Sequence, residues 1–107
     1  MKKGMIKVSV LYPNSEGKKF NMDYYCNEHF ALLNNLLGDA LKSSSIESGL
    51  AGVMPGSPAP FVAIINMYFD TLESFQQSFG PNINKLMSDL PNFTDIEPVA
   101  QISEVVF

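Results

Sequence analysis

The segment FVAIINMYFD, residues 61–70, constrains the fold more than any other part of the chain, because both of its alternating faces are apolar. One face carries Phe61, Ala63, Ile65, Met67 and Phe69, and the other carries Val62, Ile64 and Tyr68. Successive side chains of a β-strand point to opposite sides of its sheet. The pattern therefore predicts a strand that is covered on both sides. Any fold assigned to this chain has to supply two layers of cover.

Three other segments have the character of strands. Residues 5–12, MIKVSVLY, alternate with period two, and the even-numbered positions from Ile6 to Tyr12 share an apolar face. Residues 99–107, VAQISEVVF, are also apolar on alternate positions and predict the last strand. A weaker strand is expected at residues 46–53, where the chain then enters a loop rich in proline and glycine.

Two segments have helical spacing. Apolar residues recur at steps of three and four from Met22 to Leu37, Asn21 is a favourable N-cap, and Gly38 offers a stop. A second helix is predicted at residues 70–80, interrupted by a glycine–proline pair, with helical spacing resuming at residues 82–90.

The order of these elements, βαββαβ, predicts an α+β, ferredoxin-like fold. Right-handed crossovers place both main helices on one face of a four-stranded antiparallel sheet. We expect residues 1–107 to form one domain of this kind. Because two helices cover only one face, a second copy of the sheet is expected to cover the other. The pattern thus predicts a homodimer packed sheet on sheet.

Charge and composition exclude several classes of function. The net charge is −4, the seven basic residues are scattered and arginine is absent, so a nucleic-acid partner is not expected. No apolar run approaches the roughly 18–20 residues of a membrane span, and the start of the chain does not have the pattern of a signal peptide. The single cysteine forms no internal disulfide, which agrees with a cytoplasmic protein.

The stretch FNMDYYCNEHF, residues 20–30, holds the only histidine, the only cysteine and two of the four tyrosines. Tyr25, Cys26 and His29 share one surface of the predicted helix. His29 is a candidate acid or base, with a core-rim histidine bonded to a backbone carbonyl as the alternative. No second histidine or cysteine exists to complete a metal site, so no metal is expected. Cys26 is interpreted as a small buried apolar group.

Other polar side chains are candidates for the same pocket. Tyr12 and Tyr68 are expected to point from their strands toward the helices. Tyr24 and Tyr25 are adjacent on the predicted helix, so one can face the sheet and the other solvent or a dimer partner. Asn66 interrupts an apolar strand and either holds a ligand or bonds a neighbouring group. Asp95 either orients His29 or caps its own loop.

Three segments then resemble the EthD family, in the right order and over nearly the whole chain. They are NMDYYCNEHFALL, GVMPGSPAPFVAIINMYFD and SDLPNFTDIEPVAQISEVV. The resemblance implies a ferredoxin-like fold that pairs into a dimeric α/β barrel, in small proteins of bacterial catabolic or biosynthetic clusters often labelled EthD-type reductases. The positions that carry over are Asp23, Tyr24, Tyr25, His29, Asp89, Phe93 and Asp95. Ala31 stands where the family usually has proline.

Two functions remain open at this point. The first is an enzyme, a cofactor-independent oxidoreductase or isomerase, that binds a small apolar or aromatic oxygenated metabolite. His29 and Tyr25 would be catalytic there. The substrate-binding residues would be Tyr12, Tyr24, Asn66, Tyr68, Phe93 and Asp95. The second is a non-catalytic metabolite-binding or accessory dimer.

No cofactor is expected for either function. The chain lacks a nicotinamide or flavin fingerprint. Haem, which related dimeric barrels bind, is disfavoured because no arginine is present to meet its propionates.

Overall fold

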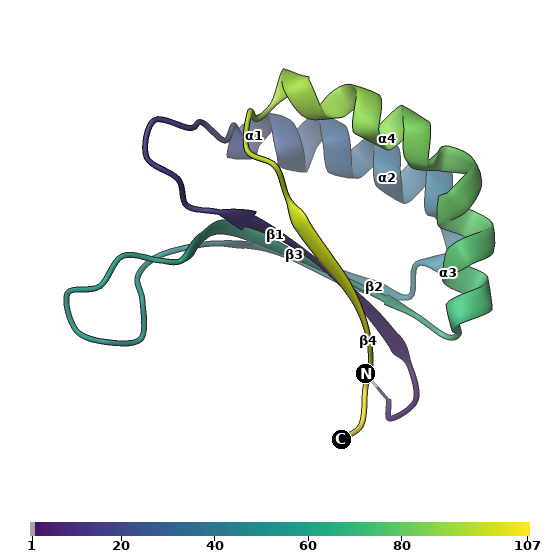
Figure 1. Ribbon diagram of the computed structural model, residues 1–107. Helices are drawn as coiled ribbons and strands as arrows, with labels where there is room; N and C mark the ends of the chain where they lie inside the picture. Colours follow the sequence, from purple (N-terminus) through teal and green to yellow (C-terminus); the bar gives the residue numbers. More distant parts are fainter. Residues whose placement is uncertain (1) are drawn as a thin grey trace.

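The computed structural model describes residues 2–107, so the first residue of the expected domain lies outside the described residues. The four strands are β1 (Ile6–Pro13), β2 (Ser43–Ser48), β3 (Phe61–Phe69) and β4 (Val99–Glu104). They form one antiparallel sheet in the order β2-β3-β1-β4. Both helical segments lie on the same side of it (Figure 1). This confirms the predicted α+β, ferredoxin-like fold.

The first helical segment consists of α1 (Met22–Tyr24), the π-helical turn η1 (Tyr25–His29), α2 (Phe30–Leu37) and the 3₁₀ turn η2 (Gly38–Ala40). The Asn21 side chain accepts a hydrogen bond of 3.0 Å from the Tyr24 N–H and caps the start. Gly38, at a φ of 55°, ends α2 in a conformation that favours glycine. The π-turn, which the sequence did not predict, is closed by the Phe30 N–H donating to the Tyr25 carbonyl.

The second helical segment consists of α3 (Leu72–Phe79), the 3₁₀ turn η3 (Gly80–Asn82), α4 (Ile83–Asp89) and the 3₁₀ turn η4 (Leu90–Asn92). Thr71 caps α3 through its side-chain oxygen, which accepts from the Ser74 N–H at 3.0 Å. The glycine–proline pair interrupts the helix, as predicted, because proline lacks the N–H that would continue the ladder. None of the helices in residues 2–107 is long and apolar enough to span a bilayer.

Strands β2 and β4 differ most from the prediction. Strand β2 runs from Ser43 to Ser48 rather than over residues 46–53, because its polar residues pair with β3 from Tyr68 back to Ala63. β-Propensity alone did not indicate these serines as a strand. Strand β4 ends at Glu104, several residues before the end of the chain.

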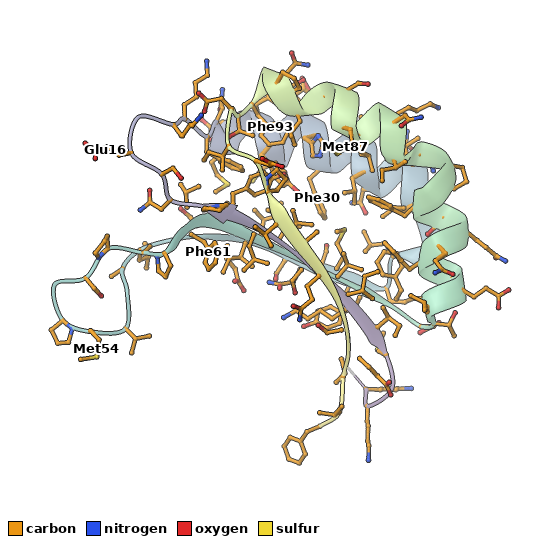
Figure 2. All side chains as sticks on the ribbon, viewed as in Figure 1. Glu16, Phe30, Met54, Phe61, Met87 and Phe93 are labelled. Carbon is orange, nitrogen blue, oxygen red and sulfur yellow. The ribbon has the colours of Figure 1, made fainter. Side chains whose placement is uncertain are left out.

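A long loop, residues 49–60, joins β2 to β3 and projects from the body of the molecule as an arm (Figures 1 and 2). Three large apolar residues on it are exposed, namely Leu50, Val53 and Met54. The Gly52 N–H donates to the Ser57 carbonyl at 2.9 Å, which folds the tip back on itself. A Cβ on Gly52 would collide with Ser57, so this close approach requires glycine.

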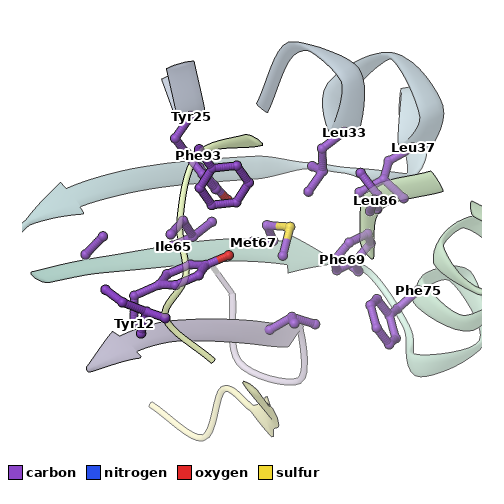
Figure 3. Close-up of a cluster of buried hydrophobic side chains, with 13 residues drawn as sticks. Tyr12, Tyr25, Leu33, Leu37, Ile65, Met67, Phe69, Phe75, Leu86 and Phe93 are labelled. Atoms are coloured by element: carbon purple, nitrogen blue, oxygen red, sulfur yellow. The ribbon is translucent and has the colours of Figure 1, made fainter. Parts of the chain in front are cut away.

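The core fills the space between the sheet and the helices. On this covered face of β3, Ala63, Ile65, Met67 and Phe69 are buried among residues from both helical segments (Figure 3). The other face of β3 has no helix over it, and there Val62, Ile64 and Tyr68 are only partly buried. We call this second surface, with the residues of β1, β2 and β4 that share it, the open face.

Candidate functional site

A cavity of about 200 Å³ lies between the sheet and the two helical segments. Its lining comes from β1, β3, β4 and both helical segments: Val10, Tyr12, Tyr25, His29, Leu33, Met67, Phe79, Ile83, Leu86, Met87, Leu90, Pro98 and Ala100. Ile83 and Met87 on α4 are also exposed to solvent, so the cavity meets the surface beside that helix. Within the described residues 2–107, the polar side chains of this lining are those of Tyr12, Tyr25 and His29.

His29 is buried, with 5% of its surface exposed, yet its ring is held by a charged partner. Its Nδ1 lies 2.9 Å from Oδ2 of Asp89 at the end of α4. An ionised carboxylate only accepts hydrogen bonds, so Nδ1 carries the proton in this pair. In the neutral imidazole, Nε2 is then left with its lone pair. Nε2 has no hydrogen-bond partner within residues 2–107. Every fully enclosed side-chain nitrogen or oxygen in that range does have a partner, so Nε2 is not fully enclosed. We therefore place Nε2 on the cavity side of the ring.

Asp89 is fixed by three donors from three different elements. Besides His29, the Tyr24 hydroxyl donates to its Oδ1 at 2.7 Å and the Asn92 amide donates at 2.8 Å. Desolvation is the largest single influence on the pKa of Asp89 and raises it, but the three hydrogen bonds together bring the pKa below its ordinary value. The hydrogen bond from the Tyr24 hydroxyl to Asp89 raises the pKa of Tyr24. Asp89 is thus a carboxylate held in its ionised form against His29.

Tyr12 and Tyr25 supply the other two polar groups of the cavity. Both side chains are almost fully buried, and burial raises the pKa of each well above that of an ordinary tyrosine. Neither hydroxyl has a hydrogen-bond partner in the described part of the chain. Because every fully enclosed side-chain oxygen there has a partner, neither hydroxyl is fully enclosed. The hydroxyls therefore open to the cavity as neutral donors. Figure 3 shows the Tyr12 hydroxyl directed toward Met67 in the middle of the core.

Local irregularities in the backbone accompany both tyrosines. The pairing of β1 with β3 shifts register between Tyr12 and Pro13, next to the cavity. Tyr25 and His29 are the first and last residues of the π-turn, and they are its two buried residues, with ring centroids 5.0 Å apart. Cys26, which follows Tyr25 in the same turn, is exposed, so its interpretation as a buried apolar group was wrong.

Phe93 packs against two aromatic residues of the site. Its ring centroid lies 4.7 Å from that of His29 and 5.1 Å from that of Tyr25, and the side chain is buried. It is not part of the cavity lining. Phe93 thus packs against the imidazole and the phenol, where contact with the aromatic faces limits their rotation.

Asp95 does not orient His29. Its Oδ1 accepts from the Lys19 N–H at 2.9 Å, an exposed contact that ties the loop before α1 to the segment after η4. That backbone hydrogen bond is the main reason that the pKa of Asp95 lies below its ordinary value. Of the two alternatives for Asp95, the loop cap is the one observed, and Asp89 occupies the position beside the histidine.

Asn66 and Tyr68 lie on the open face, away from the cavity. The Asn66 amide donates to the Ser45 hydroxyl at 3.1 Å, and Lys7 lies 6.0 Å from the centre of the Tyr68 ring. The expectation that Tyr68 points toward the helices was wrong, because it alternates with Met67 and Phe69, which face them. These two residues therefore contribute nothing to the lining around His29.

Sequence reasoning on the residues alone missed Asp89 and the apolar wall from α4. Asp89 lies 60 residues from His29, and no spacing rule joins positions so distant. The family resemblance did include Asp89 among the carried-over positions. Within residues 2–107, no group of three histidine, cysteine or acidic side chains is close enough together to hold a metal ion.

Comparisons with known proteins place this arrangement in context. An EthD-like protein from Ralstonia eutropha JMP134 is 42% identical, with a TM-score of 0.91 over 99% of this chain and 96% of that one. An ethyl tert-butyl ether D (EthD) family protein from Bacillus halodurans C-125 is 23% identical, with a TM-score of 0.65 over 94% of this chain and 97% of that one.

A dimeric ferredoxin-like protein of unknown function from Thermobifida fusca YX shares the fold. It is 14% identical, with a TM-score of 0.61 over 98% of this chain and 94% of that one. The comparison with curated proteins found no match. The family model for the EthD domain matches residues 17–97, which include His29, Asp89 and both aromatic residues that contact the imidazole. The chain therefore belongs to the EthD family.

Proposed function

We propose that the cavity binds a small, largely apolar molecule that carries oxygen, and that His29 moves a proton to or from it. The observation that carries this proposal is the pair of His29 and Asp89: the carboxylate holds Nδ1, and Nε2 remains an acceptor at the cavity. A buried imidazole fixed in one tautomer by a carboxylate is the arrangement that general acid–base catalysis uses.

The proton transfer follows from the groups present. Nε2 takes a proton from a carbon next to a ligand carbonyl, and the imidazolium that forms is stabilised by Asp89. The electron pair moves onto the carbonyl oxygen, which receives a hydrogen bond from the hydroxyl of Tyr25 or Tyr12. An isomerase returns the proton to another carbon of the same molecule.

Hydrogen–deuterium exchange tests this step without knowledge of the natural substrate. We expect the protein in D₂O to accelerate exchange of the α-protons of cyclohexanone, a one-ring ketone, measured by proton NMR. His29→Ala should remove about a hundredfold of that acceleration, because general acid–base catalysis contributes about 10²–10⁴-fold. Asn66→Ala, on the open face, is the matched control and should keep the full rate.

A second candidate function, non-catalytic binding of a metabolite, is favoured by the predominance of apolar side chains in the cavity. The same experiment separates the two functions. If cyclohexanone binds, as judged by saturation-transfer NMR, while its exchange rate equals that in buffer, the acid–base proposal is wrong and the binding function stands.

We also propose that the protein is a homodimer paired through the open face. Leu11 on β1 and Val62 and Ile64 on β3 are only partly buried there, and Val99 on β4 is exposed. Burying such apolar area stabilises association by about 25 cal/mol per Å² before the costs of association. The dimeric state of the fold relative from Thermobifida fusca supports this assignment. Light scattering at micromolar concentration tests it, and a monodisperse monomer would contradict it.

A further inference from the structure

We infer that the cavity selects uncharged molecules of one-ring size that carry a carbonyl or phenolic oxygen, and that it rejects carboxylates and phosphates. This inference rests on the proposed function, because it takes the cavity beside His29 as the ligand site. It goes further by assigning the charge, the hydrogen-bonding pattern and the size of the ligand from the groups that line the cavity.

The first argument is charge. No lysine lines the cavity, and the chain contains no arginine. The charged group in contact with the lining is the Asp89 carboxylate, whose Oδ2 lies 2.9 Å from Nδ1 of His29. A ligand carboxylate in this apolar space would lose its hydration and gain only two neutral hydroxyl donors and a protonated imidazole already paired with Asp89, without a lysine or arginine to balance its charge. Burial of a charge without a dedicated partner is costly, so anions are excluded.

The second argument is the pattern of donors and acceptors. The Tyr12 and Tyr25 hydroxyls have no partner within the described part of the chain, and burial keeps both protonated. They are free to donate to an oxygen of the ligand, whereas Nε2 of His29 is free to accept. A neutral carbonyl satisfies a hydroxyl, and a phenol satisfies Nε2 and a hydroxyl together. A hydrocarbon of the same shape leaves all three groups unpaired.

The third argument is volume. The cavity of about 200 Å³ is below the roughly 300–1,000 Å³ of sites that hold drug-sized molecules. Its inner wall consists of buried side chains, including Leu33 and Leu86. A single ring with one or two substituents fits this space, whereas a nucleotide or a flavin exceeds it.

Four probes of similar shape separate these properties: toluene, phenol, benzaldehyde and benzoate. We would titrate each into the wild-type protein near neutral pH and measure affinity by ligand-observed NMR. Phenol and benzaldehyde should bind at least about tenfold more tightly than toluene, because they pair with the free polar groups. Benzoate should bind at least about tenfold more weakly than benzaldehyde, because it is charged.

Variants assign the preference to the two hydroxyls. Tyr12→Phe combined with Tyr25→Phe keeps both rings and removes both donors. The preference for benzaldehyde over toluene should fall to within about twofold, while the affinity for toluene changes little. Tyr68→Phe removes a hydroxyl of the same kind from the open face and should leave every affinity unchanged. The near-ultraviolet circular dichroism of each variant checks that the core is intact.

The outcomes distinguish this inference from the function on which it rests. Binding of benzoate as tight as that of benzaldehyde would overturn the inference alone, as would a preference for benzaldehyde that survives in the double variant. Failure of all four probes to bind at millimolar concentration would overturn the ligand site itself, and with it the proposed function. Weaker binding of benzoate than of benzaldehyde, together with a preference for benzaldehyde over toluene that is lost in the double variant and kept in Tyr68→Phe, supports both.

Discussion

The two faces of strand β3 have similar apolar content but differ in how far they are buried. On the covered face, Ile65 and Met67 are buried under both helical segments. On the open face, Ile64 and Tyr68 are partly exposed, and Asn66 between them is paired with a serine of β2. The neighbours Ile64 and Ile65 thus have the same side chain in two environments.

The difference teaches that apolar content alone does not say where a site lies. The covered face has helices over it, and the helices bring His29, Asp89 and Tyr25 to the cavity beside the strand. The open face has comparable residues but only short polar side chains across its middle, where Ser9 pairs with Asn66 and Gln101. Chemistry is therefore expected on the first face and association on the second.

The largest expected effect compares the two adjacent isoleucines. Ile65→Ala should lower the free energy of unfolding by about 3–4 kcal/mol, because a buried isoleucine truncated to alanine leaves a cavity in the core. Ile64→Ala should cost less than half as much at low protein concentration. Urea denaturation of both variants measures the difference. Equal losses, independent of protein concentration, would mean that the two faces are equally enclosed within one chain.

The next effect concerns association through the open face. Ile64→Asp places a charge in the middle of the proposed dimer interface, where it would be desolvated, and should weaken dimerisation by about a hundredfold. The monomer should stay folded, because the residue is not in the core. Sedimentation equilibrium measures the dissociation constant. Glu104→Lys, an exposed change at the end of β4, is the control and should leave the dimer intact.

A smaller effect is expected for Asp89, which belongs to the covered side. Asp89→Asn leaves an amide in place of the carboxylate, so the tautomer of His29 is no longer fixed, and α-proton exchange should fall by at least about tenfold. Asp95→Asn, at the exposed loop contact, should not change the exchange rate. An undiminished rate in Asp89→Asn would show that the imidazole does not need the carboxylate.

The same variant has a signature in the pH dependence of stability. The folded pKa of Asp89 is lowered, so its ionised form stabilises the protein above the unfolded pKa of about 3.9. This contribution is lost as pH falls through the lower, folded pKa. Asp89→Asn should therefore lose less stability than wild type over that acid range, as measured by urea midpoints. Parallel curves for the two proteins would contradict the assigned hydrogen bonds.

The smallest effect concerns the amide on the open face. Ser45→Ala removes the acceptor of the Asn66 amide and should cost about 1 kcal/mol, because Asn66 is 6% exposed and its donor would be left without that partner. Ser44→Ala is the control, since Ser44 is exposed on the same strand and shares its side of the sheet with Met67 rather than with Asn66. Thermal unfolding distinguishes them by a shift of a few degrees.

Local patterns in the sequence predicted the elements and the sides of most residues. Period-two patterns predicted β1 and β4, and a segment apolar on both faces predicted β3. The weaker strand β2 begins and ends earlier than expected because its serines pair with β3. The cap at Asn21 and the stop at Gly38 are where local chemistry placed them. Among the candidate residues, Tyr12, Tyr25 and His29 are brought together at the cavity, whereas Tyr68 faces the other way.

By itself, the sequence determined the fold class, because period-two and helical spacing are local properties and their order admits few topologies. It also determined that one face of the sheet would lack helices. Only the tertiary structure decided that Asp89 rather than Asp95 meets His29 and that the hydroxyls of Tyr12 and Tyr25 open to one cavity. The physical reason is that these contacts join residues far apart in the chain. Their geometry depends on the packing of whole helices against the sheet, which no local pattern encodes.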